Sequence, residues 1–184
     1  MIINQDIKVF DDIIDPELQD YFYAIIFGKF KNSEIYPTVD FSVKYEPTAQ
    51  EGDNIPMSFV HILKSSSKMS QHLENFSIIP LKVCEYLKVN LKDIYFARTF
   101  LTMPYETTLE YAKPHTDLVV PHWVVLYYVN DADGDTVFFD NNNNIVERVT
   151  PKKGRVVFFN GKILHGGGIP KKFPRCAVNF DIFI

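Results

Sequence analysis

The sequence predicts a mainly β protein with helices toward its N-terminus, of the α+β class, built around a double-stranded β-helix (jelly-roll) core. Aromatic residues make up 15% of the 184 residues, which favours a β-rich core. After residue 92, short segments rich in β-branched and aromatic residues alternate with turn-forming residues. Before residue 92 the apolar residues recur at helical spacing, so helices are expected to buttress one face of the core.

Helical signals are concentrated in the first half of the chain. Asp15 followed by Pro16 is typical of a helix start, with a capping residue and a proline in the first turn. Phe22 and Ile25 then lie on one apolar helical face. Three further segments are expected: strand plus exposed loop over 36–56, a helix over 57–64, and a helix over 67–87 that breaks at Pro80.

The second half of the chain is expected to consist of short strands. They are predicted over 94–103, 123–129, 136–139, 145–149, 155–159 and 175–184. Turn-forming residues separate them, including four consecutive asparagines at 141–144 and three glycines at 166–168. Many short strands joined by tight turns are typical of a jelly-roll sandwich or barrel.

Length, charge and cysteine content narrow the class of protein. A chain of 184 residues fits a single domain. A net charge of −4 gives no general attraction to nucleic acid or to an anionic membrane, and no apolar segment approaches the ~20 residues needed to span a bilayer. The two cysteines form no CxxC pair, and the first residues do not read as a signal peptide. We therefore expect a cytoplasmic protein with buried, reduced thiols.

Three residues suggest a metal centre. His115 and Asp117 are two positions apart, so on a strand both side chains point to the same face. A single His-x-Asp occurs by chance in many chains, but His165 follows directly after the apolar strand predicted over 155–159. Two imidazoles and one carboxylate on a β scaffold form the facial triad that binds non-haem Fe(II). For His165 alone, a loop histidine that caps a backbone carbonyl is an equally good interpretation.

The last predicted strand carries a candidate anion-binding residue. Its residues 176, 178, 180 and 182 are all apolar and belong against a core. The opposite face carries Arg175, Ala177, Asn179 and Asp181 and is expected to face a polar cavity. A guanidinium on such a face can clamp a carboxylate through two parallel charge-assisted hydrogen bonds. A surface ion pair is the alternative, but it gives no reason for Arg175 to share a face with Asn179.

Taken together, these residues resemble the Fe(II)- and 2-oxoglutarate-dependent dioxygenases, in particular their prolyl-4-hydroxylase-like branch. The matching segments are His115-Thr-Asp117, Val125–Asn130, Gly134–Phe139, Pro151–Phe159, His165 and Arg175. They occur in the order and at roughly the spacings typical of that family, over about residues 93–184. The resemblance implies that 93–184 form the catalytic jelly-roll core, while 1–92 support it and supply substrate specificity.

The resemblance also assigns roles to individual residues. It implies that three side chains hold the iron: His115, Asp117 and His165. Arg175 would bind the distal carboxylate of 2-oxoglutarate, Tyr128 matches the tyrosine whose hydroxyl assists there, and Asn179 would lie near the metal-chelating end of the cosubstrate. Tyr127 would then face the opposite side of its strand, as ordinary core.

The implied reaction uses Fe(II), 2-oxoglutarate and O2, with ascorbate in a supporting role. It would hydroxylate a C–H bond of a small-molecule or peptidyl substrate, such as a prolyl residue in a peptide, and release succinate and CO2. Halogenases of this superfamily replace the iron-binding carboxylate by a small residue, and this sequence keeps Asp117, which favours hydroxylation. Neither the substrate nor the oligomeric state is predicted further.

Two other functions fit the pattern less completely. A jelly-roll binding module without turnover would not need all of the residues above, and a cupin-like metalloenzyme would bind metal without 2-oxoglutarate.

Four further side chains are each open to two interpretations. His122 could line the substrate mouth or be a satisfied rim histidine, and Arg98 could contact substrate or form a structural ion pair. His61 and His72 fall on predicted helices and are expected at the surface or between helices.

Overall fold

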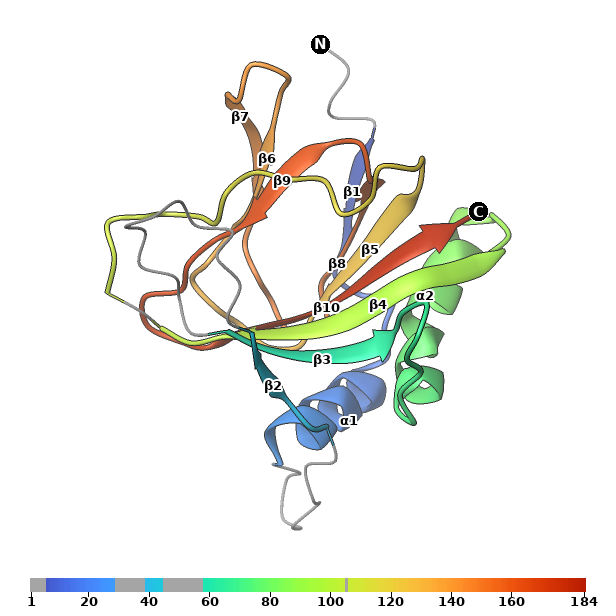
Figure 1. The fold of residues 1–184 in the computed structure, drawn as a ribbon. Coiled ribbons are helices and arrows are strands. Elements are labelled where there is room, and N and C mark those ends of the chain that lie inside the picture. The colour runs from blue at the N-terminus through green and yellow to red at the C-terminus, as the bar shows by residue number, and fades with distance from the viewer. Residues whose placement is uncertain (1–5, 29–38, 45–57, 105) are drawn as a thin grey trace.

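Two antiparallel sheets and two helices make up the parts of the chain that the computed structural model describes, residues 6–28, 39–44, 58–104 and 106–184. The strands are β1 (Ile7–Phe10), β2 (Ser42–Lys44), β3 (Ser58–Lys64), β4 (Asp93–Thr102), β5 (Trp123–Tyr128), β6 (Thr136–Phe139), β7 (Ile145–Val149), β8 (Val156–Asn160), β9 (Leu164–Gly167) and β10 (Arg175–Phe183). The helices are α1 (Pro16–Phe27) and α2 (Leu73–Leu87). The large sheet has the strand order β1-β8-β5-β10-β4-β3-β2 and the small sheet β7-β6-β9, and Figure 1 shows the two as separate layers.

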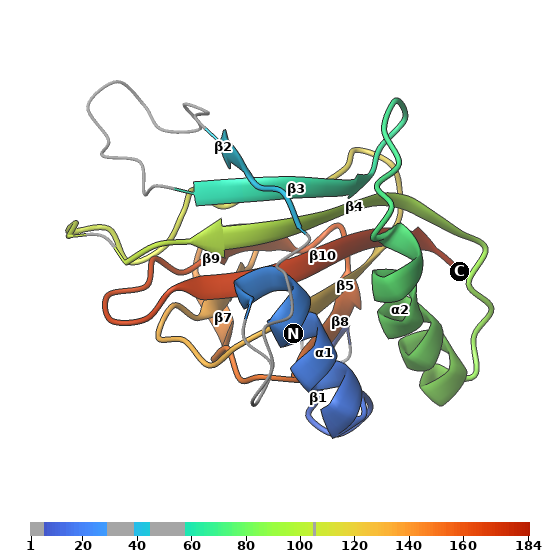
Figure 2. The same cartoon turned by 90° about the horizontal axis from the view of Figure 1, so that it is seen from below.

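The large sheet separates two apolar clusters. On one face it packs against α1 and α2, which lie across it in Figure 2, and this cluster contains Phe22, Phe76 and Tyr127. On the other face it packs against the small sheet through a second cluster that contains Tyr128 and Phe138. Successive residues of a strand point to opposite faces, so the neighbours Tyr127 and Tyr128 belong to different clusters. Sequence alternation had placed Tyr127 in the core away from the predicted site, and this is confirmed.

Strand β10 shows the same alternation and lies in the middle of the large sheet, between β4 and β5. Its apolar residues 176, 178, 180 and 182 belong to the helix-side cluster, as predicted. Arg175, Ala177 and Asn179 on its other face line a cavity between the sheets. The two free cysteines, Cys84 and Cys176, are both buried, which agrees with the expectation of buried thiols.

The six strands predicted after residue 92 are all present, with ends that differ by a residue or two. The helix predicted to start at Asp15 and Pro16 is confirmed as α1, although the Asp15 side chain makes no capping hydrogen bond and pairs with Lys82 at 2.8 Å instead. The asparagine run forms the turn between β6 and β7, where Asn143 adopts a left-handed conformation with φ of 63°.

Two predictions for the first half are wrong. The described residues 58–64 of the segment predicted as a helix over 57–64 form strand β3, in which His61 and Leu63 are buried and the backbone pairs with β4. The second helix starts at Leu73 and continues through Pro80 without a break. Pro80 is itself buried together with the apolar residues of α2, so tertiary packing outweighs the hydrogen bond that the proline removes. Of the segment 36–56, Ser42–Lys44 form a strand, and 36–38 and 45–56 lie outside the described residues.

The region 1–92 is more than helical and loop support. It supplies strands β1, β2 and β3 to the large sheet, where β1 pairs with β8 at one end of the strand order and β3 pairs with β4 toward the other. Strand β9 was also missed, because its sequence, Leu-His-Gly-Gly, carries no strand signal. No helix within the described ranges is long and apolar enough to cross a membrane.

Candidate metal centre and cosubstrate cavity

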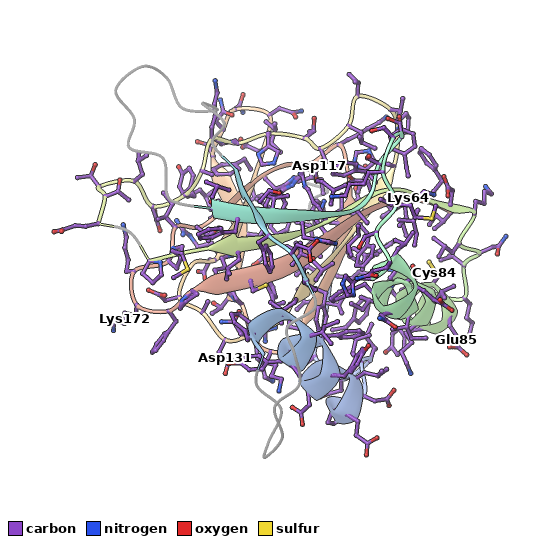
Figure 3. The ribbon with its side chains drawn as sticks, turned by 60° about the horizontal axis from the view of Figure 1, so that its bottom comes forward. Lys64, Cys84, Glu85, Asp117, Asp131 and Lys172 are labelled. Atoms are coloured by element: carbon purple, nitrogen blue, oxygen red, sulfur yellow. The ribbon has the colours of Figure 1, made fainter. Side chains whose placement is uncertain are left out.

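A cavity of about 490 Å³ lies between the two sheets, and side chains from both sheets line it. The small sheet contributes His165 and Thr136, the large sheet contributes Arg175, and the segment before β5 contributes His115 and Asp117. The described structure therefore brings the predicted metal ligands and the predicted carboxylate clamp to one cavity. In Figure 3 the labelled residue Asp117 lies on the side of the strands away from helix α1.

The three predicted metal ligands lie within reach of one ion. Each offers one ligand atom, and these atoms lie within 4.8 Å of one another. Asp117 Oδ2 is 3.4 Å from His165 Nε2, and Asp117 Oδ1 is 3.8 Å from His115 Nε2. The backbones of the two histidines also form a β-bridge, in which each N–H donates to the carbonyl oxygen of the other at 2.9 and 3.0 Å. This bridge fixes the spacing of two ligands that are far apart in the sequence.

Hydrogen bonds at Nδ1 set the orientation of both imidazoles. His115 Nδ1 donates to the carbonyl of Lys113, and His165 Nδ1 donates to the carbonyl of Ile163, each at 3.0 Å. Because a carbonyl oxygen can only accept, the proton of each neutral ring is on Nδ1 and the Nε2 lone pair is free for a metal. Partial desolvation of the His115 ring, together with the neighbouring His165, lowers the pKa of His115 and favours this neutral form.

Two donors hold the carboxylate of Asp117. Arg98 Nη2 donates to Oδ1 at 2.5 Å, and Asn179 Nδ2 donates to Oδ2 at 3.3 Å. Burial alone would raise the pKa of Asp117, but the neighbouring His165 and the charge of Arg98 hold that pKa below its ordinary value. The carboxylate is therefore ionised. Of the two interpretations of Arg98, the structure shows the ion pair, formed with a predicted metal ligand.

This donor set fits Fe(II). Two neutral imidazole nitrogens and one ionised carboxylate oxygen converge on the side of an open cavity. That is the ligand set of a facial triad, which leaves further coordination positions for ligands from the cavity.

Arg175 is buried in the same cavity, with 6% of its surface exposed. Its Nε donates to the carbonyl of Gly134 and its Nη2 donates to Thr136 Oγ1, both at 2.8 Å. Within the described part of the chain, no carboxylate lies within ion-pair distance of its guanidinium. A buried charge without an ionic partner is costly, so this guanidinium is suited to receive the carboxylate of a ligand.

Thr136 connects Arg175 to Tyr128. The Tyr128 hydroxyl lies 2.6 Å from Thr136 Oγ1 and donates to the carbonyl of Val149 at 3.3 Å. Thr136, not Tyr128, lines the cavity, so the threonine presents the hydroxyl beside the guanidinium. Sequence reasoning missed Thr136. The available signal was a single polar residue at the start of an otherwise apolar strand.

The remaining histidines, His61, His72 and His122, are all buried. His122 does not lie on the rim: it is only 4% exposed, and its Nε2 lies 3.6 Å from Oδ1 of Asp181, which alternation places on the same strand face as Arg175 and Asn179. Burial, followed by the charge of Asp117, raises the pKa of Asp181 to about 7. His61 lies on β3 instead of a helix, and its ring centroid is 5.7 Å from that of His72.

Comparisons with known proteins bear on the fold. No protein-family profile and no curated protein matches this sequence. Among solved structures, an oxidoreductase of the 2OG-Fe(II) oxygenase family from Burkholderia pseudomallei superposes with a TM-score of 0.72 at 10% identity, covering 97% of this chain and 85% of its own. A prolyl hydroxylase from Trichoplax adhaerens, in complex with a hypoxia inducible factor peptide fragment, gives 0.66 at 14% identity, with coverages of 100% and 87%.

A third similar structure comes from a virus. The collagen prolyl hydroxylase of Paramecium Bursaria Chlorella virus-1, as its 2OG complex, gives a TM-score of 0.61 at 14% identity and covers 99% of this chain and 98% of its own. The chain therefore has the fold of these oxygenases over nearly its whole length. The predicted jelly-roll core buttressed by helices is confirmed.

Proposed function

We propose that the protein is an Fe(II)- and 2-oxoglutarate-dependent dioxygenase that hydroxylates a C–H bond. One observation carries this proposal: a triad suited to Fe(II) and a buried guanidinium without an ionic partner lie in the same cavity. The triad alone would suit many metalloproteins. Its combination with a carboxylate clamp suits a cosubstrate that binds the metal at one end and carries a carboxylate at the other.

Each residue then has a defined task. His115, Asp117 and His165 hold the iron through two Nε2 atoms and one carboxylate oxygen. When bound, Fe(II) supplies the redox chemistry that couples the decarboxylation of 2-oxoglutarate to succinate and CO2 with the hydroxylation of substrate by O2. Arg175 binds the distal carboxylate of 2-oxoglutarate. Thr136 Oγ1 accepts from that guanidinium and donates to the Tyr128 hydroxyl, so the two hydroxyl groups hold Arg175 in place.

The apolar walls of the cavity complete the site. Leu126, Phe159 and Ala177 line it and belong to the apolar cluster between the two sheets. Such walls exclude water and strengthen the charge-assisted hydrogen bonds to the cosubstrate. Asn179 lines the same cavity and donates to Asp117, which places its amide beside the metal ligands.

A prolyl residue in a peptide is the first substrate to test. Two of the three solved structures compared above are prolyl hydroxylases, and one of them was solved with a peptide fragment bound. The alternative is a small molecule. Region 1–92 remains our candidate for substrate specificity, and its Ser58 at the start of β3 lines the cavity.

An anaerobic absorbance titration with Fe(II) and 2-oxoglutarate tests the proposal. We expect a visible charge-transfer band only when both are present, because the keto acid chelates the protein-held iron. H115A and D117A should show no band and form no succinate, while their thermal unfolding shows an intact fold. Iron binding without a band would favour the cupin-like metalloenzyme, and the absence of iron binding would favour the non-catalytic binding module.

A further inference from the structure

Asp181 is a carboxyl group in an apolar setting. It lies on the cavity-side face of β10, two residues beyond Asn179, and it is fully buried. Its cross-strand neighbours are Phe96 on β4 and Val124 on β5. These three residues form a cross-strand row that is otherwise apolar. A buried carboxyl group in this row destabilises the fold unless polar partners compensate for its lost hydration. An apolar side chain would suit this row better, so the presence of a carboxyl group calls for another explanation.

His122 is the partner of Asp181. Its Nε2 lies 3.6 Å from Asp181 Oδ1, and its Nδ1 donates to the carbonyl of Val120 at 2.8 Å. With Nδ1 protonated, a neutral ring turns its Nε2 lone pair toward the carboxyl group. The pair is therefore attractive only when it holds one additional proton, on either the carboxyl group or Nε2. In both forms the pair is neutral overall.

The backbone holds the His122 ring in this position. A Cβ atom added at Gly161 would lie 2.1 Å from His122 Nε2, so the ring packs directly on the glycine. Gly161 N–H also donates to the carbonyl of His122 at 3.0 Å. Any larger residue at position 161 would push the ring out of its place beside Asp181.

Asn179 connects this pair to the candidate metal centre. Its Nδ2 lies 3.5 Å from Asp181 Oδ1 and 3.3 Å from Asp117 Oδ2. Because carboxylate oxygens accept hydrogen bonds, the NH2 end of the amide faces both groups and its orientation is determined. Asn179 thus bridges Asp181 and Asp117 by hydrogen bonds, and His122 Nε2 lies behind Asp181 at 3.6 Å.

We propose that Asp181 and His122 are positioning residues, which hold the Asn179 amide toward Asp117 and so fix the orientation of the iron-binding carboxylate. This inference rests on the function proposed above. Partners behind the ligands of a metal site commonly change metal affinity by about 10–100-fold when they are removed. A carboxyl group in an apolar row is then retained for the hydrogen bond that it accepts from Asn179.

The test compares D181L with D181N in the full chain. D181L removes every hydrogen bond but suits the apolar row, so we expect an unchanged or higher melting temperature of the metal-free protein and about tenfold weaker Fe(II) binding. D181N keeps an amide oxygen at the position of Oδ1, which accepts from Asn179 Nδ2 without carrying a charge. It should therefore bind Fe(II) nearly as tightly as the wild type and give the same band with 2-oxoglutarate.

Thr99 offers a matched control. Its buried hydroxyl on β4 has no hydrogen-bond partner among the described residues, and it lies on the helix side of the large sheet. T99V should leave Fe(II) affinity unchanged. If D181L does not fold, H122F provides the second variant, because it keeps a ring of similar size but loses Nε2; we expect the same loss of Fe(II) affinity.

Two outcomes would overturn the positioning role. The first is wild-type Fe(II) affinity in folded D181L or in H122F. The second is an equal loss in D181N and D181L, because charge and not hydrogen-bond geometry would then be responsible. Failure of the proposed function is distinguishable, since the wild-type protein itself would then bind no Fe(II) or give no band with 2-oxoglutarate.

Discussion

Arg98 and Asn179 lie directly opposite each other on the neighbouring strands β4 and β10, and they donate to the two different oxygens of the same carboxylate, that of Asp117. The carboxylate is thus held from both sides by residues of the large sheet, although Asp117 itself belongs to the segment before β5. This register couples the packing of two strands to the orientation of a candidate metal ligand.

Replacement of Arg98 by methionine should weaken Fe(II) binding. Without the guanidinium, the pKa of Asp117 rises toward its ordinary value, and protons compete better with the metal. Fe(II) titration should therefore show a loss that grows as the pH falls toward the ordinary carboxyl pKa of 3.8. Lys113 lines the same cavity, and K113M serves as the control for a lost positive charge. Equal losses in R98M and K113M would refute a specific role of Arg98.

Substitutions around Arg175 should weaken 2-oxoglutarate binding more than Fe(II) binding. We expect R175A to raise the KM for 2-oxoglutarate by 10-fold or more, since a charge-assisted hydrogen bond contributes about 1.5–3 kcal/mol. T136V and Y128F should each have smaller effects, and the double variant should lose less than the sum, because Tyr128 acts through Thr136. Calorimetric titration of 2-oxoglutarate checks this. Full additivity would show that Tyr128 contacts the cosubstrate independently.

Alanine substitutions at two glycines, Gly168 and Gly154, should have different effects: one on 2-oxoglutarate binding and the other on the stability of the fold. A Cβ at Gly168 would lie 2.5 Å from the carbonyl oxygen of Asp135, next to Gly134, whose own carbonyl accepts from Arg175. G168A should shift this backbone and weaken 2-oxoglutarate binding. Gly154, with φ of 83°, packs instead against Gln19. G154A should lower the free energy of unfolding by about 1–3 kcal/mol and leave cosubstrate affinity unchanged.

The ion pair of Asp11 with Arg155 should make a pH-dependent contribution to stability. Arg155 Nε donates to Asp11 Oδ1 at 2.6 Å, and hydrogen bonding to this guanidinium lowers the pKa of Asp11 from 3.8 to about 2. The stabilisation is present above the ordinary pKa and disappears as the pH falls through about 2. Because both side chains are partly exposed, D11N should cost only about 0.5–1 kcal/mol at neutral pH. Thermal unfolding at neutral and strongly acidic pH measures it, and a pH-independent difference would contradict the assignment.

The sequence predicted the second half of the chain well because its strands alternate between two buried faces. In β10 the alternation of Arg175, Ala177 and Asn179 with apolar residues is local information, available without the structure. Strand β3 lacks it, since an apolar run of this length fits a helix or a strand equally, and its pairing with β4 decides the outcome. Strand β1 is short and depends in the same way on β8.

In the candidate site, too, local patterns could be predicted from the sequence and contacts between distant residues could not. Side chains with distinctive chemistry, such as those of the triad and Arg175, were found from motif and spacing. Thr136, the contacts of Asp181 and the burial of His122 were not, because each depends on a partner distant in the sequence. Strand register decides these contacts: the amide of Asn179 lies between Asp181 and Asp117, one of the candidate metal ligands.

The central position of β10 has a consequence for how the protein folds. Strands β4 and β5 do not pair with each other; each pairs with β10, which follows both in the chain. During synthesis their inner edges therefore stay open until β10 emerges, and such non-local pairing slows folding and exposes strand edges to aggregation. Because β10 also carries Arg175 and Asn179, the cavity does not exist before that step. Its ligands can stabilise the finished sheet, but they cannot guide the early steps of its assembly.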